Sequence, residues 1–331
     1  MPQLPHPLPP AEAALRVDYR RAPLAELLAE PGVLAVFGFG ADAAPAHEDP
    51  RYLHVALPAF GVPAYECWTV EGEVRHGHRD GIAWSEGGAL QFCALEVADD
   101  GDVEAATRAA YRRLHEWLAN SDYPHPLRIW NYLDAITEGN GDAERYRRFC
   151  VGRAQGIGRD LAPTELPAAT AIGHPHRTGR FQLYWLAARA PGTPVENPRQ
   201  VQAWRYPRQY GPQAPGFARA LLPPSTAMPL LISGTAAIVG HASQHAGSLQ
   251  TQFDEVVANL GSLVDAARAV HPGLPPREST GTRLKAYARD AEALPIVDAL
   301  LAERFPDVPR IVLHGHVCRR ELAVEIDGVH G

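Results

Sequence analysis

The sequence predicts an α+β protein built from two related modules that form a pseudo-dimer within one chain. Short apolar runs of strand length alternate with amphipathic stretches of helical spacing. The same order of elements occurs twice: a strand pair, a long helix, a strand, a shorter helix and two strands. A repeat of this size indicates two packed copies of one folding unit rather than a solenoid.

The first half of the chain supplies the elements of one module. Its apolar runs predict strands over 34–39, 63–70, 87–97, 127–136, 168–173 and 181–188. Residues 103–118 repeat apolar side chains at helical spacing, and Asp100 and Asp102 favour the N-terminus of that helix. A second helix is predicted over 144–159.

The second half repeats this order. Residues 228–243 (MPLLISGTAAIVGHAS) predict a buried strand, a tight passage at Ser233-Gly234-Thr235 and a further strand. Apolar spacing then predicts helices over 249–270 and 293–305 and strands over 283–288, 310–317 and 322–326.

Composition excludes several classes of protein. Hydrophobic residues make up 46% of the 331, as in a globular protein with a core. The net charge of −7, without a Lys/Arg run, predicts no nucleic-acid partner, and no apolar stretch is long enough to cross a bilayer. The 4 scattered cysteines form no CxxC pair, which favours a reducing cytoplasm over a disulfide framework or zinc site.

Four parts are expected along the chain. Residues 1–20 are predicted to be a flexible proline-rich arm, and 21–190 the first module. Residues 191–227 are expected to form an ordered loop rich in proline, aromatic residues and arginine, before the second module at 228–331. Long ordered loops of this kind are more often functional than decorative.

The two halves also align residue by residue. Residues 128–132 (RIWNY) match 283–287 (RLKAY), and 171–174 (AIGH) match 313–316 (LHGH). Chance agreement between two α+β patterns is the competing interpretation.

Extending the alignment sets 320–326 against 180–186 and places Glu325 opposite Trp185. The modules are therefore predicted to differ chemically, with one functional site, in the second.

The last predicted strand carries a candidate acid. Glu321, Ala323, Glu325 and Asp327 share one face, because alternate residues of a strand point to the same side. From spacing alone, the solvated face of an edge strand explains this pattern better than catalysis does. Cys318 is likewise either functional or a small buried hydrophobe.

Other motifs offer weaker alternatives. Histidines recur as three His-x-His pairs, each able to give two metal ligands and, with a carboxylate, a non-haem iron site: His76/His78, His174/His176 and His314/His316. Ordinary surface or hydrogen-bonded histidine is the competing interpretation. Gly38-Phe39-Gly40 lacks the following helix of a dinucleotide site, and Ser233 lacks the elbow of a serine hydrolase.

Arginine is the usual side chain for holding carboxylates, because its planar guanidinium bonds both oxygens. Arg147 and Arg153 lie on the 144–159 helix, Arg205 in the aromatic loop and Arg310 before a closing strand. Single arginines are mostly surface charges, so only their convergence would indicate a binding site.

These residues carry a resemblance to known families. Residues 230–326 resemble the RidA/YjgF fold, through the Ser-Gly-Thr strand, the long helix, RLKAY leading to Asp290, and the terminal VEID. Over the whole chain the sequence is more similar to the chorismatases, also called pteridine-dependent dioxygenase-like proteins. The supporting motifs are Asn131–Leu133, Glu144–Arg147, Gly152-Arg153, Glu196–Gln200, Tyr206-Pro207, Tyr210–Pro212, Phe217–Ala220 and Ser233–Ala236.

The resemblance implies two modules of mixed β-sheet with helices on one face, and an enzyme that cleaves chorismate and releases pyruvate. Family members that form 3-hydroxybenzoate, alone or with 4-hydroxybenzoate, resemble this chain in having a cysteine seven residues before the terminal glutamate, as Cys318 precedes Glu325. A protonated Glu325 would protonate the enol-ether methylene, which requires a raised pKa in an apolar pocket. No metal or organic cofactor is required.

Two arginine clamps would fix the two carboxylates of chorismate. The motifs and the arginines together give these substrate-binding candidates: Tyr132, Arg147, Arg153, Arg205, Tyr210, Arg219, Gly234, Thr235, Ala236 and Arg310. The expected protein is cytoplasmic, a monomer or small homo-oligomer, with a small-molecule substrate. Three alternatives stay open: hydrolysis of chorismate to a dihydroxycyclohexadiene carboxylate, a metal-dependent dioxygenase, and a RidA-like imine deaminase or ligand-binding protein.

Overall fold

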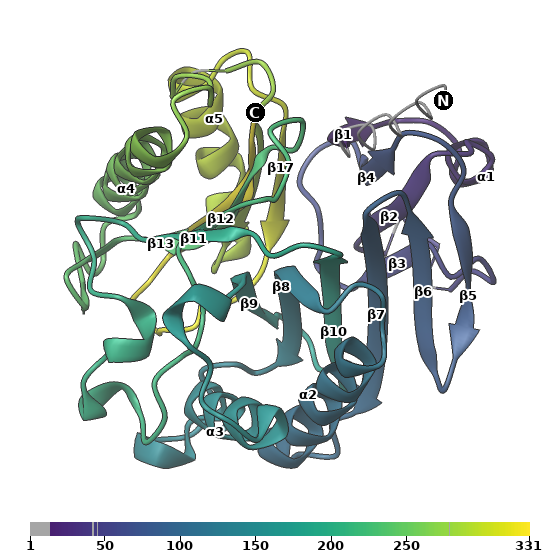
Figure 1. The fold of residues 1–331 in the computed structure, drawn as a ribbon. Coiled ribbons are helices and arrows are strands. Elements are labelled where there is room, and N and C mark those ends of the chain that lie inside the picture. The colour runs from purple at the N-terminus through teal and green to yellow at the C-terminus, as the bar shows by residue number, and fades with distance from the viewer. Residues whose placement is uncertain (1–13, 42, 45, 278) are drawn as a thin grey trace, which may run out of the picture.

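The computed structural model describes residues 14–41, 43–44, 46–277 and 279–331. Within these residues the strands form two six-stranded sheets, one four-stranded sheet and a two-stranded hairpin. Figure 1 shows the sheets toward the middle of the molecule and the helices outside them. None of the helices in the described part has the length and apolar character needed to cross a membrane.

The first six-stranded sheet belongs to the first predicted module. Its order is β5 (Arg75–Arg79), β6 (Ile82–Gly87), β7 (Leu90–Ala98), β10 (Arg180–Ala188), β8 (His125–Asp134) and β9 (Ala168–His174). Only β8 and β9 run parallel. Helices α2 (Val103–Ala119) and α3 (Arg145–Ile157) cover one face, where Phe181, Leu183 and Trp185 of β10 are buried against them.

The second six-stranded sheet repeats this topology position by position. Its order is β11 (Thr193–Val195), β12 (Ala220–Leu222), β13 (Leu230–Ala236), β18 (Val324–His330), β16 (Arg283–Ala288) and β17 (Arg310–His314). Again the last pair is parallel. Helices α4 (Leu249–Val270) and α5 (Leu294–Arg304) pack on its outer face. The predicted α+β fold of two related modules is confirmed.

The N-terminal strands form the four-stranded sheet. Its elements are β1 (Leu15–Arg20), α1 (Leu24–Leu28), β2 (Val33–Phe39), β3 (Tyr52–Val55) and β4 (Tyr65–Val70). The order β1-β4-β2-β3, with β2 and β3 parallel, is that of the last four strands of each six-stranded sheet, β7-β10-β8-β9 and β13-β18-β16-β17. The first 70 residues therefore contain a third, shortened copy of the module.

Part of the expected flexible arm is ordered. Leu15–Arg20 pair with β4 along their whole length, because alternate apolar residues, Leu15 and Val17, are buried. Residues 1–13 of the predicted arm lie outside the described residues. The 191–227 segment, expected to be a loop, contains β11 and β12, so the second sheet begins before residue 228.

The three sheets share one central core. Phe37 of β2 lies 5.6 Å from the ring of Trp130 of β8, and Trp68 of β4 lies 5.3 Å from Trp130, between ring centroids. Backbone bridges at Ala59↔Leu313 and Gly173↔His316 join neighbouring copies.

The Ser-Gly-Thr motif does not separate two strands as predicted. It lies inside β13, where the pairing with β18 slips between Ile232 and Thr235. Over this interval three residue steps on β13 correspond to two on β18, which is a β-bulge of one residue. The equivalent pair, β7 with β10, has an unbroken register. The predicted tight passage at Ser233-Gly234-Thr235 is therefore a β-bulge within one strand.

The final strand is central rather than at an edge. β18 lies between β13 and β16, so Glu325 and Asp327 are only 5% and 1% exposed. The interpretation of these carboxylates as a solvated edge face is wrong for this reason. Glu321 precedes the strand, which begins at Val324.

The alignment of Glu325 with Trp185 is also wrong. Tyr132 of β8 lies opposite Gln182, and Tyr287 of β16 lies opposite Glu325. Because Tyr132 and Tyr287 match in the repeat, the counterpart of Glu325 is Gln182. A shift of three residues moves a strand's side chains to the other face, and Trp185 indeed packs toward the helices.

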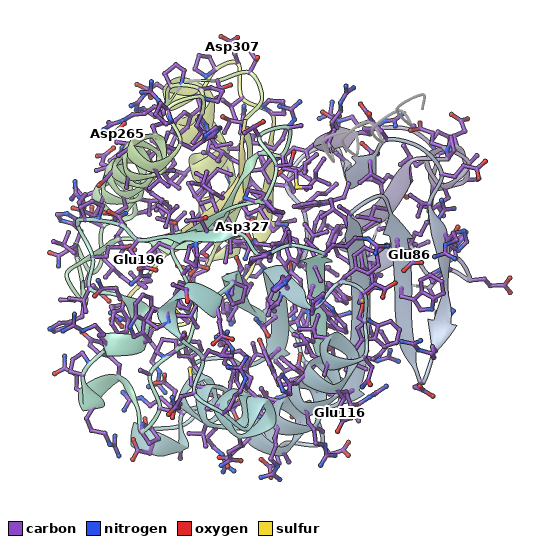
Figure 2. All side chains as sticks on the ribbon, viewed as in Figure 1. Glu86, Glu116, Glu196, Asp265, Asp307 and Asp327 are labelled. Carbon is purple, nitrogen blue, oxygen red and sulfur yellow. The ribbon has the colours of Figure 1, made fainter. Side chains whose placement is uncertain are left out.

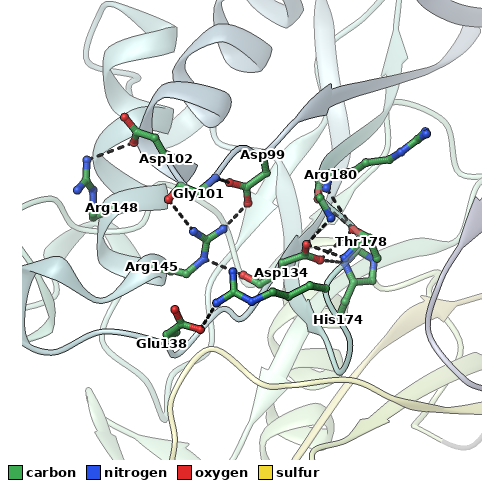
Figure 3. Close-up of polar contacts among 12 residues, drawn as sticks. Asp99, Gly101, Asp102, Asp134, Glu138, Arg145, Arg148, His174, Thr178 and Arg180 are labelled. Carbon is green, nitrogen blue, oxygen red and sulfur yellow. Dashed lines mark hydrogen bonds and ion pairs between the residues drawn. The ribbon is translucent and has the colours of Figure 1, made fainter.

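Polar contacts fix the end of the first module that meets the cavity described below. The Asp134 carboxylate accepts a hydrogen bond from the backbone N–H group of Thr178 at 2.7 Å (Figure 3). It accepts another from the backbone N–H group of Gly179, also at 2.7 Å. Arg145, at the start of α3, donates to the Asp134 carbonyl at 2.9 Å and pairs with Asp99. These contacts hold α3 in place, and α3 carries Arg147 and Arg153.

Candidate active site

A cavity of about 460 Å³ lies between the two full modules. The first module lines it from β8, β9 and α3, and the second from β13, β18 and the 318–321 segment. The 206–219 part of the proline-rich segment completes the wall. Eight of the twelve predicted site residues line it: Arg147, Arg153, Tyr210, Arg219, Gly234, Ala236, Cys318 and Glu325.

The other four lie elsewhere. The Tyr132 hydroxyl is in the central core, 3.5 Å from that of Tyr287. Arg205 is exposed on a 3₁₀ turn. The buried Thr235 hydroxyl donates to the Ser233 carbonyl at 3.0 Å, and Arg310 pairs with Asp298 of α5 at 2.7 Å.

Glu325 is the buried acid of the cavity. Its carboxyl receives no hydrogen bond from any residue that the structure describes, and it lies against the backbone of Gly234. A methyl group on Gly234 would overlap this carboxyl, at 2.8 Å from Cδ. The β-bulge and the missing side chain together make the space that Glu325 occupies.

Burial first, and Asp327 second, raise the pKa of Glu325 to about 8. Arg128, Arg219 and Arg289 act in the opposite direction. At neutral pH the side chain is therefore mostly protonated and able to donate a proton.

Two arginines in the wall are buried without a carboxylate partner among the described residues. Arg153 and Arg219 are each 5% exposed, and the Nε of each has no hydrogen-bond partner there. Arg153 donates to the Gly216 carbonyl, and Arg219 donates to the Tyr206 hydroxyl at 2.7 Å. A buried cation is costly without a counter-ion, so the pair suits a ligand with two anionic groups.

Arg147, Arg319 and Arg320 also line the cavity. Arg319 stacks on Tyr210 with 4.1 Å between its guanidinium carbon and the ring centroid, and donates to the His241 carbonyl at 2.9 Å. Arg147 lies 3.9 Å from the exposed carboxylate of Asp142. The cavity thus has five arginines in its wall.

Cys318 lies close to the acid. Burial, followed by the neighbouring Glu325, raises the pKa of its thiol to about 12, so it is neutral at physiological pH. Its side chain packs against the cores of both modules. A neutral thiol here is a weak hydrogen-bond donor and a small surface beside Glu325.

Several lining residues were missed. Asn131, Glu144, Tyr206 and Phe217 lie inside motifs that carried the resemblance, which could have singled them out. Thr170 gave no signal, because its role depends on the contact between the two sheets.

The histidine pairs make other contacts. His174 Nδ1 pairs with Asp134 at 3.1 Å, and His314 Nε2 bonds the Arg289 carbonyl at 3.0 Å. Across the described ranges, no group of three or more His, Cys, Asp or Glu side chains has an arrangement that could hold a metal ion. The iron-site alternative therefore has no support from these residues.

Comparison with known proteins identifies the relatives. Residues 66–187 match the family described as "Chorismatase FkbO/Hyg5-like, N-terminal". The chain is 38% identical over 278 residues to a 3-hydroxybenzoate synthase of Streptomyces hygroscopicus, and the match covers 81% of both chains. It is 36% identical over 273 residues to a chorismatase of Streptomyces rapamycinicus, covering 80% of this chain and 81% of the relative.

A crystal structure of a chorismatase is similar over nearly the whole chain. It covers 96% of this chain and 98% of its own, with a TM-score of 0.83 and 30% sequence identity. With this similarity in sequence and in fold, the chain belongs to the chorismatase family.

Proposed function

We propose that this protein converts chorismate to 3-hydroxybenzoate and pyruvate. One observation carries the proposal: a buried glutamate without a hydrogen-bond donor shares a cavity with two buried arginines that lack a carboxylate partner. The relative named 3-hydroxybenzoate synthase supports the product.

Binding uses the charges of the wall. Arg153 lies on α3 of the first module and Arg219 just before β12 of the second, so each module contributes one buried guanidinium group to the wall. Each holds one carboxylate of chorismate. Gly234 leaves the floor flat, so that the ring lies beside the Glu325 carboxyl.

The chemistry begins with proton transfer. Glu325 protonates the methylene carbon of the enolpyruvyl ether, and the bond between the ether oxygen and the ring then breaks, so that pyruvate leaves with the electrons of that bond. To give 3-hydroxybenzoate, the oxygen of the neighbouring ring hydroxyl moves to the carbon that pyruvate left, and the ring loses one proton as it becomes aromatic. The atoms of chorismate equal those of hydroxybenzoate plus pyruvate, so this conversion needs no oxidant. A protonated carboxyl at pH 7 is the form that the first step requires.

Cys318 acts on the product rather than on the first step. Its neutral thiol lies at the acid's side, where it limits the approach of water to the reacting ring. Cys318→Ala should therefore move the product from 3-hydroxybenzoate toward the diol or the 4-isomer, as product chromatography will reveal. An unchanged product profile would assign Cys318 to packing alone.

The test of the proposal is direct. The purified, EDTA-treated protein is incubated with chorismate, pyruvate is followed with a lactate dehydrogenase coupling, and the ring product is separated by chromatography. We expect pyruvate and 3-hydroxybenzoate. A diol product would favour the hydrolytic alternative, and activity that disappears with EDTA would favour a metal enzyme.

The decisive variant is Glu325→Gln. It should lower pyruvate release by about a thousandfold, within the range of general acid catalysis, with an unchanged fold by circular dichroism. Glu303→Gln, the same substitution at an exposed position of α5, is the control and should be fully active. Turnover like that of the natural protein in Glu325→Gln would overturn the assignment. Cytoplasmic location and a monomer or small homo-oligomer remain predictions.

A further inference from the structure

Two carboxyl groups on the same face of β18 have opposite surroundings. Glu325 receives no hydrogen bond from the described residues, whereas Asp327 is surrounded by donors. Its Oδ2 accepts from the Thr170 hydroxyl at 2.8 Å and the Tyr287 hydroxyl at 3.1 Å. Arg128 Nη2 lies 2.9 Å from the same oxygen.

These donors belong to a charge network at the centre of the molecule, where Figure 2 labels Asp327. Lys285 Nζ lies 3.8 Å from Asp327 Oδ1 and 2.6 Å from the Glu66 carboxylate of β4. Arg128, Lys285, Glu66 and Asp327 are each at most 3% exposed. Two cations therefore balance two carboxylates, with Arg128 closest to Asp327 and Lys285 closest to Glu66.

Thr170 connects this network to the cavity. Its hydroxyl accepts from Arg128 Nη2 at 2.5 Å and donates to Asp327. The same side chain lines the cavity, and its hydroxyl would be 3.4 Å from a methyl group on Gly234. Thr170 and Glu325 thus both border Gly234, and Thr170 also contacts the buried charges.

We infer that Asp327 is a positioning residue for the acid: by binding Arg128 and carrying its own negative charge, it keeps Glu325 protonated. This inference rests on the proposed function, in which the protonated form is the active one. The two carboxyl groups differ in their surroundings, and this difference assigns their roles.

The charges that face Glu325 come from several elements. Asp327 of its own strand disfavours the ionised form. Arg128 of β8, Arg219 before β12 and Arg289 after β16 favour it. The neutral groups nearby are Cys318 and the Tyr146 hydroxyl of α3, both of which interact with Glu325. Glu144 and Glu321 line the same cavity. Without Asp327, the largest charge effects on Glu325 would be those of the three cations.

Asp327→Asn tests the inference through the pH profile of kcat/KM for pyruvate release. Its alkaline limb, where Glu325 loses its proton, should move to lower pH by at least about one unit, which is a tenfold loss at alkaline pH. Activity below the shifted limb should be kept. A loss by the same factor at every pH would overturn the inference, because it would indicate a structural role only.

Arg128→Met gives the opposite change. It removes the cation and leaves Asp327 in place, so the alkaline limb should move to higher pH. Shifts of opposite sign cannot come from general loosening of the fold. If Asp327→Asn does not fold, this variant decides: an unshifted or lowered limb would overturn the inference.

Glu66→Gln is the matched control, since it removes the other carboxylate of the network at its far end. The alkaline limb of its kcat/KM profile should move less than half as far as that of Asp327→Asn. Equal shifts would contradict a specific role for Asp327.

A measurement without substrate separates this inference from the proposed function. The infrared carbonyl band lost in Glu325→Gln is assigned to Glu325 and titrated in the other variants. A lowered midpoint in Asp327→Asn supports the inference even if chorismate is not turned over. An unmoved midpoint in a protein that does turn over chorismate sinks the inference alone.

Discussion

The strand pairs β7–β10 and β13–β18 occupy the same place in two copies of one module, yet only the second lies at a site. In β7–β10 the register is continuous and the position equivalent to Glu325 is Gln182. Gln182 Nε2 donates to the His54 carbonyl at 3.0 Å and to Glu96 at 2.6 Å. In β13–β18 a bulge interrupts the pairing and Glu325 has no such partner.

The difference shows how a repeated frame gains a site. Where the first copy has an amide whose Nε2 is hydrogen-bonded and a regular strand pair, the second copy has a carboxyl without a hydrogen-bond donor among the described residues, beside a β-bulge. Functional groups held in this way usually cost stability, which the rest of the fold supplies. The first copy keeps the stable arrangement and contributes α3 with its arginines instead.

Among the variants that test this difference, Gly234→Ala, which fills the bulge, should have the largest effect on catalysis. In Gly234→Ala the added methyl group would overlap the Glu325 carboxyl and displace it. We expect kcat for pyruvate release to fall by about a hundredfold or more, since misplacing a catalytic group by about 1 Å has this cost. Stopped-flow or coupled assays will measure it.

The control uses the first copy. Ala94 occupies the regular strand position where β13 has its additional residue, and Ala94→Gly should lower stability by about 1 kcal/mol with unchanged kcat. A Gly234→Ala variant as active as the natural protein would show that the bulge does not position the acid.

Substitutions of the arginines test substrate binding, and their expected effect is smaller than that of Gly234→Ala. Arg219→Gln should raise KM for chorismate roughly 10–100-fold, because a buried charge-assisted contact contributes about 1.5–3 kcal/mol. Arg205→Gln, in the same segment but exposed, and Arg310→Gln, already paired with Asp298, should leave KM unchanged. Equal effects at all three positions would mean that the arginines act through net charge.

Placing the residue type of one copy at the equivalent position of the other, Gln182 or Glu325, tests how the two copies differ in their contribution to stability. Gln182→Glu should lower the free energy of unfolding by about 2 kcal/mol, because it removes a buried donor and adds a carboxylate beside Glu96. Glu325→Gln should stabilise the protein, most of all at alkaline pH. Urea titrations at pH 5 and pH 8 measure both.

The sign follows from the raised pKa of Glu325, about 8 in the folded protein against 4.5 for the free side chain. Between these values the folded state keeps a proton that the unfolded state has lost. The natural protein therefore loses stability as pH rises through this window, by up to about 1.4 kcal/mol per pH unit, and Glu325→Gln removes that loss. Parallel pH curves for the two proteins would contradict a buried neutral Glu325.

Local pattern was enough to predict most of the elements. Residues 249–270 and 283–288 form the predicted helix and strand without any change of boundary, because long apolar periodicity specifies an amphipathic element. The third, shortened copy was missed, since its helix has 5 residues and leaves almost no helical periodicity. The residue of the first module that is equivalent to Glu325 could be identified only from the register of paired strands, which the alignment of single strands does not contain.

The site was predictable where one motif carried one role. Glu325, Cys318 and Gly234 lie together as expected. Arginines were predicted unevenly, because a guanidinium on a long side chain reaches whichever carboxylate the tertiary fold brings near. Arg310 forms an ion pair with Asp298 on a neighbouring helix, whereas Arg319 stacks on the ring of Tyr210 at the cavity.

The central ionic network has a consequence for the order of folding. Lys285 and Glu66 are 219 residues apart in the chain, and Arg128 and Asp327 are 199 apart. Lys285 and Glu66 join the second six-stranded sheet to the N-terminal sheet, and Arg128 and Asp327 join the two six-stranded sheets. Neither pair forms until those sheets meet, and contacts of such separation form late and slowly. Until then these charges stay hydrated, so an intermediate with only two sheets docked cannot exclude water from its centre. The network therefore makes completion of the core depend on the first 70 residues as much as on the last strand.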